Sequence, residues 1–116
     1  MTPAPSAPSG LVRRGEVYLI NLNPTRGREI RKTRPCVIVS PDELNAHLGT
    51  FIVAPLTRGS HAYPFRIPCR FGNQAGHIVL DQLRTVDRER LFRRLGALPQ
   101  ATTARALTVL QEMFAP

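Results

Sequence analysis

The chain has 116 residues, 42% of them hydrophobic, which fits one domain with one modest core. Its formal net charge is +8, and fifteen of its sixteen basic residues are arginine, a balance that favours polyanionic partners. No apolar run approaches membrane-spanning length, and the first residues lack the pattern of a secretory signal, so we expect a cytoplasmic protein.

The first twelve residues differ in composition from the rest of the chain. Residues 1–12 are rich in Pro, Ser and Ala and show no apolar periodicity, so we expect a disordered tail there. Residues 13–116 carry the periodic patterns of a folded protein. We expect them to form a single domain without internal repeats.

The first half of the domain predicts three strands. Residues 15–22 alternate between apolar and polar side chains, and residues 35–40 form a continuous apolar run typical of a buried strand. Residues 50–57 predict a third strand, in which Pro55 lies near the end, where a missing backbone donor is tolerated. Residues 41–47 predict a helical turn between the second and third strands.

The second half predicts three more strands. They are expected over residues 65–69, 76–86 and 92–98, separated by segments rich in turn-forming residues. Asp87 is a candidate N-cap for a short turn over residues 88–91.

A closing helix is predicted after Pro99, a residue that suits the first helical turn. Its apolar face is expected to contain Ala104, Leu107, Leu110 and Phe114, which recur at helical spacing. The connections between strands are too short for parallel crossovers. The sequence therefore predicts a mainly β protein, a small antiparallel and partly closed barrel with a C-terminal α-helix.

Cysteine and histidine give no sign of a metal site. Cys36 and Cys69 lie in apolar, strand-like contexts without paired-ligand spacing, so we expect both to be buried free thiols. His47, His61 and His77 are scattered along the sequence, and we expect them to be solvated or locally hydrogen-bonded rather than catalytic. The eight acidic residues do not cluster as ligands, so we expect no metal or other cofactor.

The segment NPTRGREIRKTRPCVIVSP, residues 23–41, places one carboxylate, that of Glu29, among five cations. A preference for Arg codons would also explain the many arginines of the chain. The five cations of this segment, however, project from one end of the predicted barrel, an arrangement that indicates polyanion binding. A carboxylate beside a phosphate site repels the ligand, so Glu29 either abstracts a proton or pairs with a neighbouring arginine. The sequence leaves both open. The cations are Arg26, Arg28, Arg31, Lys32 and Arg34.

A carboxylate, a fixed guanidinium and a hydroxyl together meet the requirements of metal-free RNA cleavage. The ribose 2′-hydroxyl loses a proton as it attacks phosphorus, charge grows on the phosphoryl oxygens, and the leaving 5′-oxygen needs a proton. Glu29 can supply a base, Arg34 a fixed charge and Thr57 a hydroxyl. Pro35 restricts the backbone of Arg34 to extended geometry, which makes its direction predictable. Without further information, the end of a strand is the favoured explanation for Thr57.

Several motifs, in their order along the chain, resemble the MazF/PemK family of toxin endoribonucleases. They are GEVY in the first strand, the NP…G.E loop, RP.VIVSP, Pro-x-Thr at the end of the third strand, and LDQ.RTVD. The similarity extends from about Arg14 to Phe114, which is nearly all of the predicted domain.

The resemblance implies a homodimeric, SH3-like barrel of the kind that PemK and CcdB toxins share. It implies metal-free cutting of single-stranded RNA at a short sequence, leaving a 2′,3′-cyclic phosphate and a 5′-hydroxyl, and a cognate MazE-like antitoxin as partner. The catalytic arginine, threonine and loop glutamate of the family fall on Arg34, Thr57 and Glu29. Gln82 falls on a position that family members use near the RNA groove.

The resemblance is incomplete in the loop. Many relatives have Ser-Glu-Gln where this chain has Arg28-Glu29-Ile30, which changes the expected base preference. The PemK branch uses an Arg-x-Asp motif, whereas Arg84 and Asp87 have a different spacing, so we favour the MazF-like arrangement. The candidate RNA-binding residues are Arg26, Arg28, Arg31, Lys32, Arg58, His61 and Gln82.

Two other functions are compatible with such a barrel. A non-catalytic poison of DNA gyrase, like the CcdB toxins, would depend on the closing helix and would not need Arg34 or Thr57. A plain nucleic-acid-binding barrel would bind RNA tightly without turnover.

Overall fold

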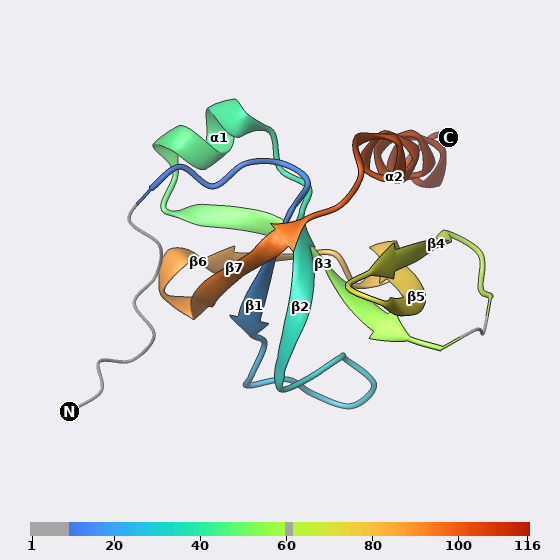
Figure 1. Cartoon of the computed structure of the whole chain (residues 1–116), viewed down its shortest axis with the longest axis horizontal. Helices are drawn as coiled ribbons and strands as arrows, with labels where there is room; N and C mark the ends of the chain where they lie inside the picture. The colour runs from blue at the N-terminus through green and yellow to red at the C-terminus, as the bar shows by residue number, and fades with distance from the viewer. Residues whose placement is uncertain (1–9, 60–61) are drawn as a thin grey trace.

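The computed structural model describes residues 10–59 and 62–116 (Figure 1). Most of the predicted tail, and His61, therefore lie outside the described residues. Val12, which we placed in the tail, is only 1% exposed and packs into the core, so the packed part of the chain begins earlier than predicted. None of the helices in the described ranges has the length and apolar character needed to cross a membrane.

The described part of the chain contains seven strands, two α-helices and two 3₁₀ turns. The predicted strands and helices are present with small shifts in their ends, except for the predicted strand 76–86. The elements are β1 (Glu16–Asn21), β2 (Thr33–Ile38), α1 (Asp42–His47), β3 (Thr50–Arg58), β4 (Arg66–Phe71), β5 (Gln74–Val79), η1 (Leu80–Gln82), β6 (Arg84–Asp87), η2 (Arg88–Arg90), β7 (Leu91–Ala97) and α2 (Gln100–Met113).

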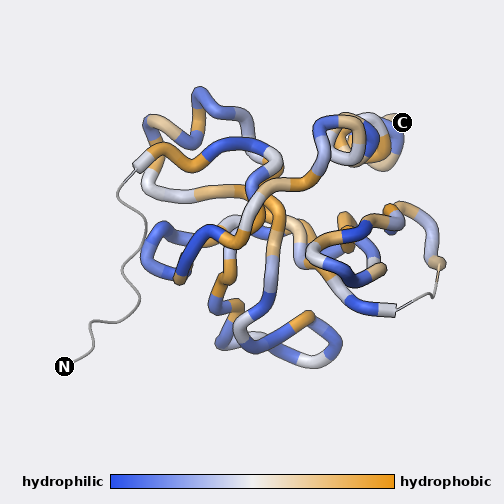
Figure 2. Tube along the Cα trace, viewed as in Figure 1, coloured by the Kyte–Doolittle hydropathy of each residue, from blue (hydrophilic) through white to orange (hydrophobic). Residues whose placement is uncertain are grey.

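All strand pairs are antiparallel, and the ladder runs β4-β5-β3-β2-β1-β7, with β6 added to β3. Within the described ranges β6 and β7 form no ladder with each other, so the sheet is open. The coarse prediction of an antiparallel, mainly β protein with a C-terminal helix is confirmed. Figure 2 shows hydrophobic segments along the central strands and a largely hydrophilic β1–β2 loop.

The two faces of the sheet bury separate apolar clusters. One contains Ile20, Cys36 and Val53, whereas the other contains Val37 and Ala54. This division follows from strand alternation, because successive side chains point to opposite faces. Both clusters therefore hold β2 and β3 in register near the middle of the sheet.

The predicted strand 76–86 was wrong as a single element. Val53 of β3 pairs with Arg84 of β6, and Leu56 of β3 pairs with Ile78 of β5. The segment between Ile78 and Arg84 therefore contains more residues than the part of β3 that lies opposite it. The turn η1 takes up this insertion and interrupts the strand. As a result, Gln82 projects from the sheet instead of continuing its ladder.

The ends of the later elements follow local chemistry. The predicted N-cap is confirmed, since Asp87 Oδ1 accepts a hydrogen bond of 3.0 Å from the Glu89 N–H. The predicted apolar face of α2 was correct only in part. Thr103 and Ala106 are buried and Leu110 packs against the core as predicted, whereas Phe114 is 69% exposed. Gly15 allows the close approach at Thr103, since a Cβ there would lie 3.1 Å from the Thr103 hydroxyl oxygen.

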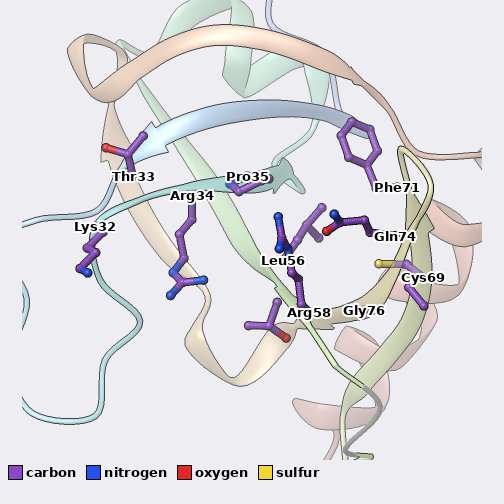
Figure 3. Close-up of a pocket in the computed structure, with 12 residues that line it drawn as sticks. Lys32, Thr33, Arg34, Pro35, Leu56, Arg58, Cys69, Phe71, Gln74 and Gly76 are labelled. Carbon is purple, nitrogen blue, oxygen red and sulfur yellow. The ribbon is translucent and has the colours of Figure 1, made fainter.

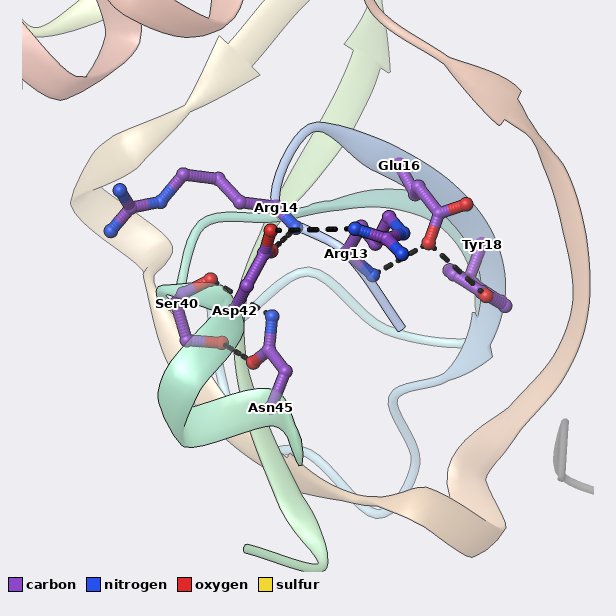
Figure 4. A network of polar contacts seen from close by, with 7 residues as sticks. All are labelled: Arg13, Arg14, Glu16, Tyr18, Ser40, Asp42 and Asn45. Atoms are coloured by element: carbon purple, nitrogen blue, oxygen red, sulfur yellow. Dashed lines mark hydrogen bonds and ion pairs between the residues drawn. The ribbon is translucent and has the colours of Figure 1, made fainter. Parts of the chain in front are cut away.

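The short helix α1 is fixed by a buried polar contact (Figure 4). Asn45 is 1% exposed; its Nδ2 donates to the Ser40 carbonyl at 2.9 Å, and its Oδ1 accepts from the Ser40 hydroxyl at 2.5 Å. The Ser40 hydroxyl also accepts a bond of 3.0 Å from the Ile52 N–H. This network joins the end of β2, α1 and β3.

We expect Asn45→Ala to lower the free energy of unfolding by about 1–3 kcal/mol, because it leaves buried polar groups of Ser40 without a partner. Chemical denaturation measures the change. Glu43→Ala, at an exposed position of the same helix, is the matched control. Equal stability of the two variants would contradict the importance of this network.

Candidate active site

The cationic loop joins β1 to β2 and extends away from the sheet (Figure 1). The side chains of Arg26, Arg28, Arg31 and Lys32 are exposed. The predicted concentration of positive charge at one end of the fold is therefore present in three dimensions. Such a surface favours the phosphate backbone of a nucleic acid.

The base of this loop is closed by hydrogen bonds to the main chain of Lys32. The Leu22 N–H donates to the Lys32 carbonyl at 3.0 Å, and the Lys32 N–H donates to Asn23 Oδ1 at 3.0 Å. Lys32 itself has a φ of 72°, a left-handed conformation that costs a non-glycine residue about 1 kcal/mol or more. The hydrogen bonds on both sides of Lys32 hold it in that conformation.

The carboxylate of Glu29 is bound within its own loop. Its Oε1 accepts a hydrogen bond from the Arg26 N–H, and its own N–H donates to the Arg26 carbonyl at 3.1 Å. Within the described residues Glu29 forms no ion pair, so the alternative of pairing with a neighbouring arginine is not realised. Its Oε2 has no hydrogen-bond partner in these ranges, which leaves one oxygen able to accept a proton.

Arg34 and Thr57 lie where β2 and β3 separate. The ladder between these strands ends at the pair Cys36–Pro55, and Pro35 and Pro55 have no N–H with which to extend it. Two residues further along each strand are Arg34 and Thr57. Because side chains alternate, both lie on the face of Cys36 and Pro55.

Arg34 is partly buried and has one internal partner. Its Nε donates to the Arg31 carbonyl at 3.0 Å, and its terminal nitrogens make no hydrogen bond within residues 10–59 and 62–116. The Thr57 hydroxyl is likewise without a hydrogen bond in the described part of the chain. The structure therefore presents a fixed guanidinium and a hydroxyl that a ligand can engage.

A pocket of about 480 Å³ contains Arg34, Thr57 and Arg58 among its lining residues. Its opposite wall comes from the β4–β5 hairpin. Figure 3 shows Arg34 on one side of this space and Phe71 and Gln74 across from it. The pocket is thus built by two strand ends that separate and a hairpin that faces them.

Glu29 lines a different pocket, of about 520 Å³, together with Arg28, Gln82 and Pro55. The structure therefore does not bring Glu29 into the same pocket as Arg34 and Thr57. The two pockets are neighbours, since Pro55 and Thr57 are alternate residues of β3, about 7 Å apart along the strand. The three predicted catalytic residues lie around one end of β3.

A second carboxylate, that of Asp81, also lines the pocket of Glu29. Arg66 binds both of its oxygens, at 2.9 and 3.0 Å, and these hydrogen bonds lower the pKa of the Asp81 carboxyl. Asp81 is therefore occupied by its ion pair. Glu29 is the carboxylate of this pocket that keeps a free oxygen.

Sequence reasoning missed the contribution of the β4–β5 hairpin. Gly76 lies against Thr57 so closely that a Cβ built on it would be 1.9 Å from the Thr57 carbonyl oxygen. The available signal was a glycine within a strand pattern, which indicates close approach of another backbone. Gly76 therefore sets the distance between β5 and Thr57.

The two cysteines differ in environment. Cys36 is fully buried, as expected, and burial raises the pKa of its thiol to about 12. Cys69 is only partly buried and lines the pocket of Arg34, so the prediction of full burial was wrong for it. Cys69 lies in an apolar strand pattern, from which the adjoining pocket could not be predicted. Within the described residues no group of three His, Cys, Asp or Glu side chains could hold a metal ion.

Comparison with known proteins places the chain in a class. Residues 13–114 match the family described as PemK-like, MazF-like toxin of type II toxin-antitoxin system. Endoribonuclease MazF9 of Mycobacterium tuberculosis is 31% identical over 105 residues, covering 82% of this chain and 89% of the relative. Endoribonuclease MazF of Staphylococcus epidermidis is 34% identical over 99 residues, covering 78% and 81%.

Solved structures share the fold at lower identity. MazF from Deinococcus radiodurans superimposes with a TM-score of 0.79 at 24% identity, covering 90% of this chain and 96% of that one. A MazE-MazF structure from the same organism gives 0.73 at 21% identity, covering 91% and 97%. The sequence and fold together define a toxin of the type II toxin-antitoxin class. The chain belongs to the PemK/MazF toxin family.

We expect Gly76→Ala to lower the free energy of unfolding by about 2 kcal/mol or more, because the added methyl group forces β5 away from the Thr57 carbonyl. Thermal or chemical denaturation measures this loss. Gly49→Ala is the matched control, since a Cβ at Gly49 meets nothing within 4 Å. The tight approach at Gly76 would be refuted if both variants were equally stable.

We expect the thiol of Cys36 to make stability depend on pH above 9. Its folded pKa is about 12 and its ordinary value is 9.0, so the unfolded thiol ionises first. The contribution is complete below pH 9 and is lost as pH rises toward 12. Relative to Cys36→Val, the wild-type chain should lose about 1.4 kcal/mol more per pH unit above 9. Urea unfolding at several pH values tests this, and identical slopes would contradict it.

Proposed function

We propose that the chain is the toxin of a type II toxin-antitoxin system and acts as a metal-independent, sequence-specific endoribonuclease on single-stranded RNA. The observation that carries this proposal is the placement of Arg34 and Thr57 in one pocket, beside the pocket of Glu29 and below a cationic loop. The relatives from M. tuberculosis and S. epidermidis are endoribonucleases, which agrees with this activity.

In the proposed reaction, Glu29 accepts the proton of a ribose 2′-hydroxyl through its free oxygen. The 2′-oxygen then attacks the adjacent phosphorus, and the bond from phosphorus to the 5′-oxygen breaks. Arg34 stabilises the charge that grows on the phosphoryl oxygens. The Thr57 hydroxyl donates a hydrogen bond to the leaving 5′-oxygen, which takes up a proton from water, and Glu29 later returns its proton to the solvent. The products are a 2′,3′-cyclic phosphate and a 5′-hydroxyl.

The RNA strand would follow the cationic surface into the pockets. The exposed cations of the β1–β2 loop and Arg58 bind its phosphates, and His61, which lies outside the described residues, stays a predicted contact. Cutting mRNA places the protein in the cytoplasm. A cognate, MazE-like antitoxin is the expected partner, as the existence of a MazE-MazF structure from D. radiodurans supports. We expect it to occupy the same basic surface.

We further infer that residues 13–116 form one SH3-like barrel that acts as a homodimer. The strands β6 and β7 lie at the two edges of the five-strand order β6-β3-β2-β1-β7 and are joined by the short turn η2. Arg84 and Arg90 reach across to the carbonyls of Leu22 and Asn21 at 2.9 and 3.2 Å. These contacts support a barrel that side chains close.

We expect purified protein to cut a long RNA of high sequence complexity in the presence of EDTA, and mapping of both ends identifies the products. Arg34→Ala, Thr57→Val and Glu29→Gln should each lower the cleavage rate by about 100-fold or more, because each removes a group needed in the transition state. Arg105→Ala, which removes an exposed arginine from α2, is the control of equal charge and should retain activity.

Intact RNA with folded wild-type protein would overturn the proposal. Tight RNA binding without cleavage would support a plain nucleic-acid-binding barrel instead. If Arg34→Ala remained fully toxic in cells, a gyrase poison would be favoured, because that function does not need the pocket.

A further inference from the structure

Gln82 contacts the main chain on both sides of Glu29. It projects from η1 and is partly buried. Its Oε1 accepts a hydrogen bond of 2.6 Å from the Ile30 N–H, and its Nε2 donates to the Arg28 carbonyl at 3.4 Å. One side-chain amide therefore bridges the residue before Glu29 and the residue after it.

We propose that Gln82 is a positioning residue that holds Glu29 at the cleavage site. This inference rests on the proposed ribonuclease function. The amide directs one lone pair of its oxygen and one N–H of its nitrogen to the protein backbone, which fixes the amide relative to the loop. The residue acts on the reaction through the backbone of Glu29.

The loop needs such an anchor because few other interactions hold its tip. Its cations repel one another, and Gly27 adopts a left-handed φ of 57° at the turn. Ile30 is the loop side chain that packs against the core cluster. The N–H of Ile30 is also the group that binds Gln82. The segment from Arg28 to Ile30 is therefore held by the apolar packing of Ile30 and by the hydrogen bonds of Gln82.

Two further side chains hold the start of the loop by hydrogen bonds to its main-chain carbonyls. Arg84 donates to the Leu22 carbonyl at 2.9 Å, and Arg90 donates to the carbonyls of Asn21 and Asn23. These contacts lie at the exit of β1, whereas Gln82 binds beside Glu29. Loss of Gln82 should therefore release the tip of the loop while its base stays attached.

Trypsin tests the anchoring without RNA, because the loop contains several arginines. Cleavage after Arg26, Arg28 and Arg31 should be about fivefold faster in Gln82→Ala than in the wild type, as expected for the loss of a net hydrogen bond in a local opening equilibrium. Gln82→Glu keeps an acceptor for the Ile30 N–H and should fall between the two. Gln100→Ala, at an exposed position of α2, should match the wild type, and circular dichroism checks that all variants are folded.

RNA cleavage kinetics test the effect on Glu29. Gln82→Ala should lower kcat about tenfold with little change in KM, and in a Glu29→Gln background the same change should add less than twofold, because both act through one group. A raised KM with unchanged kcat, or unchanged loop proteolysis, would overturn the positioning role. Absence of cleavage by the wild type would instead overturn the proposed function, and proteolysis would still report separately whether Gln82 anchors the loop.

Discussion

The site depends on the end of the hydrogen-bonded ladder between β2 and β3. Pro35 and Pro55 lie on neighbouring strands and cannot donate backbone hydrogen bonds. Beyond them β2 and β3 separate, and β3 continues beside β5. A pocket opens at this divergence, with Arg34 and Thr57 on its walls. A continuous ladder would have paired these two residues within the sheet and closed the space between them.

Charge and position are supplied by different parts of the chain. The β1–β2 loop provides exposed cations and Glu29, but its own contacts are few. The segment from Gln82 to Arg90 binds this loop through carbonyl and N–H groups of its main chain. Most side chains of the β1–β2 loop therefore do not take part in holding the loop in place. Such an arrangement lets loop composition determine which nucleic acid is bound while the scaffold keeps the loop in place.

Much of the fold could be predicted because the signals are local. The first three strands alternate or form apolar runs, and the cap at Asp87 depends on residues adjacent in sequence. The interruption at η1 could not be predicted, since Leu80–Gln82 contains neither glycine nor proline and the insertion is defined by pairing with β3. The face of α2 was predicted only in part: Leu110 packs as predicted, but Thr103 is buried against Gly15, far away in the sequence.

The candidate site was predictable in its residue types and less so in its arrangement. Arg34 and Thr57 occur in recognisable motifs, and strand alternation brings them to one face. The separate pocket of Glu29 depends on η1, which sequence patterns did not reveal. The proposed positioning role of Gln82 could not be predicted, because hydrogen bonds to the main chain of a distant segment leave no sequence pattern in either segment.

The hydrogen bond from Arg34 Nε to the carbonyl of Arg31 joins the pocket to the adjoining β1–β2 loop. Displacement of Arg31 would break this bond and leave the guanidinium of Arg34 without its internal partner. The direction of a charge inside the pocket is therefore set by the main chain of a loop at the rim.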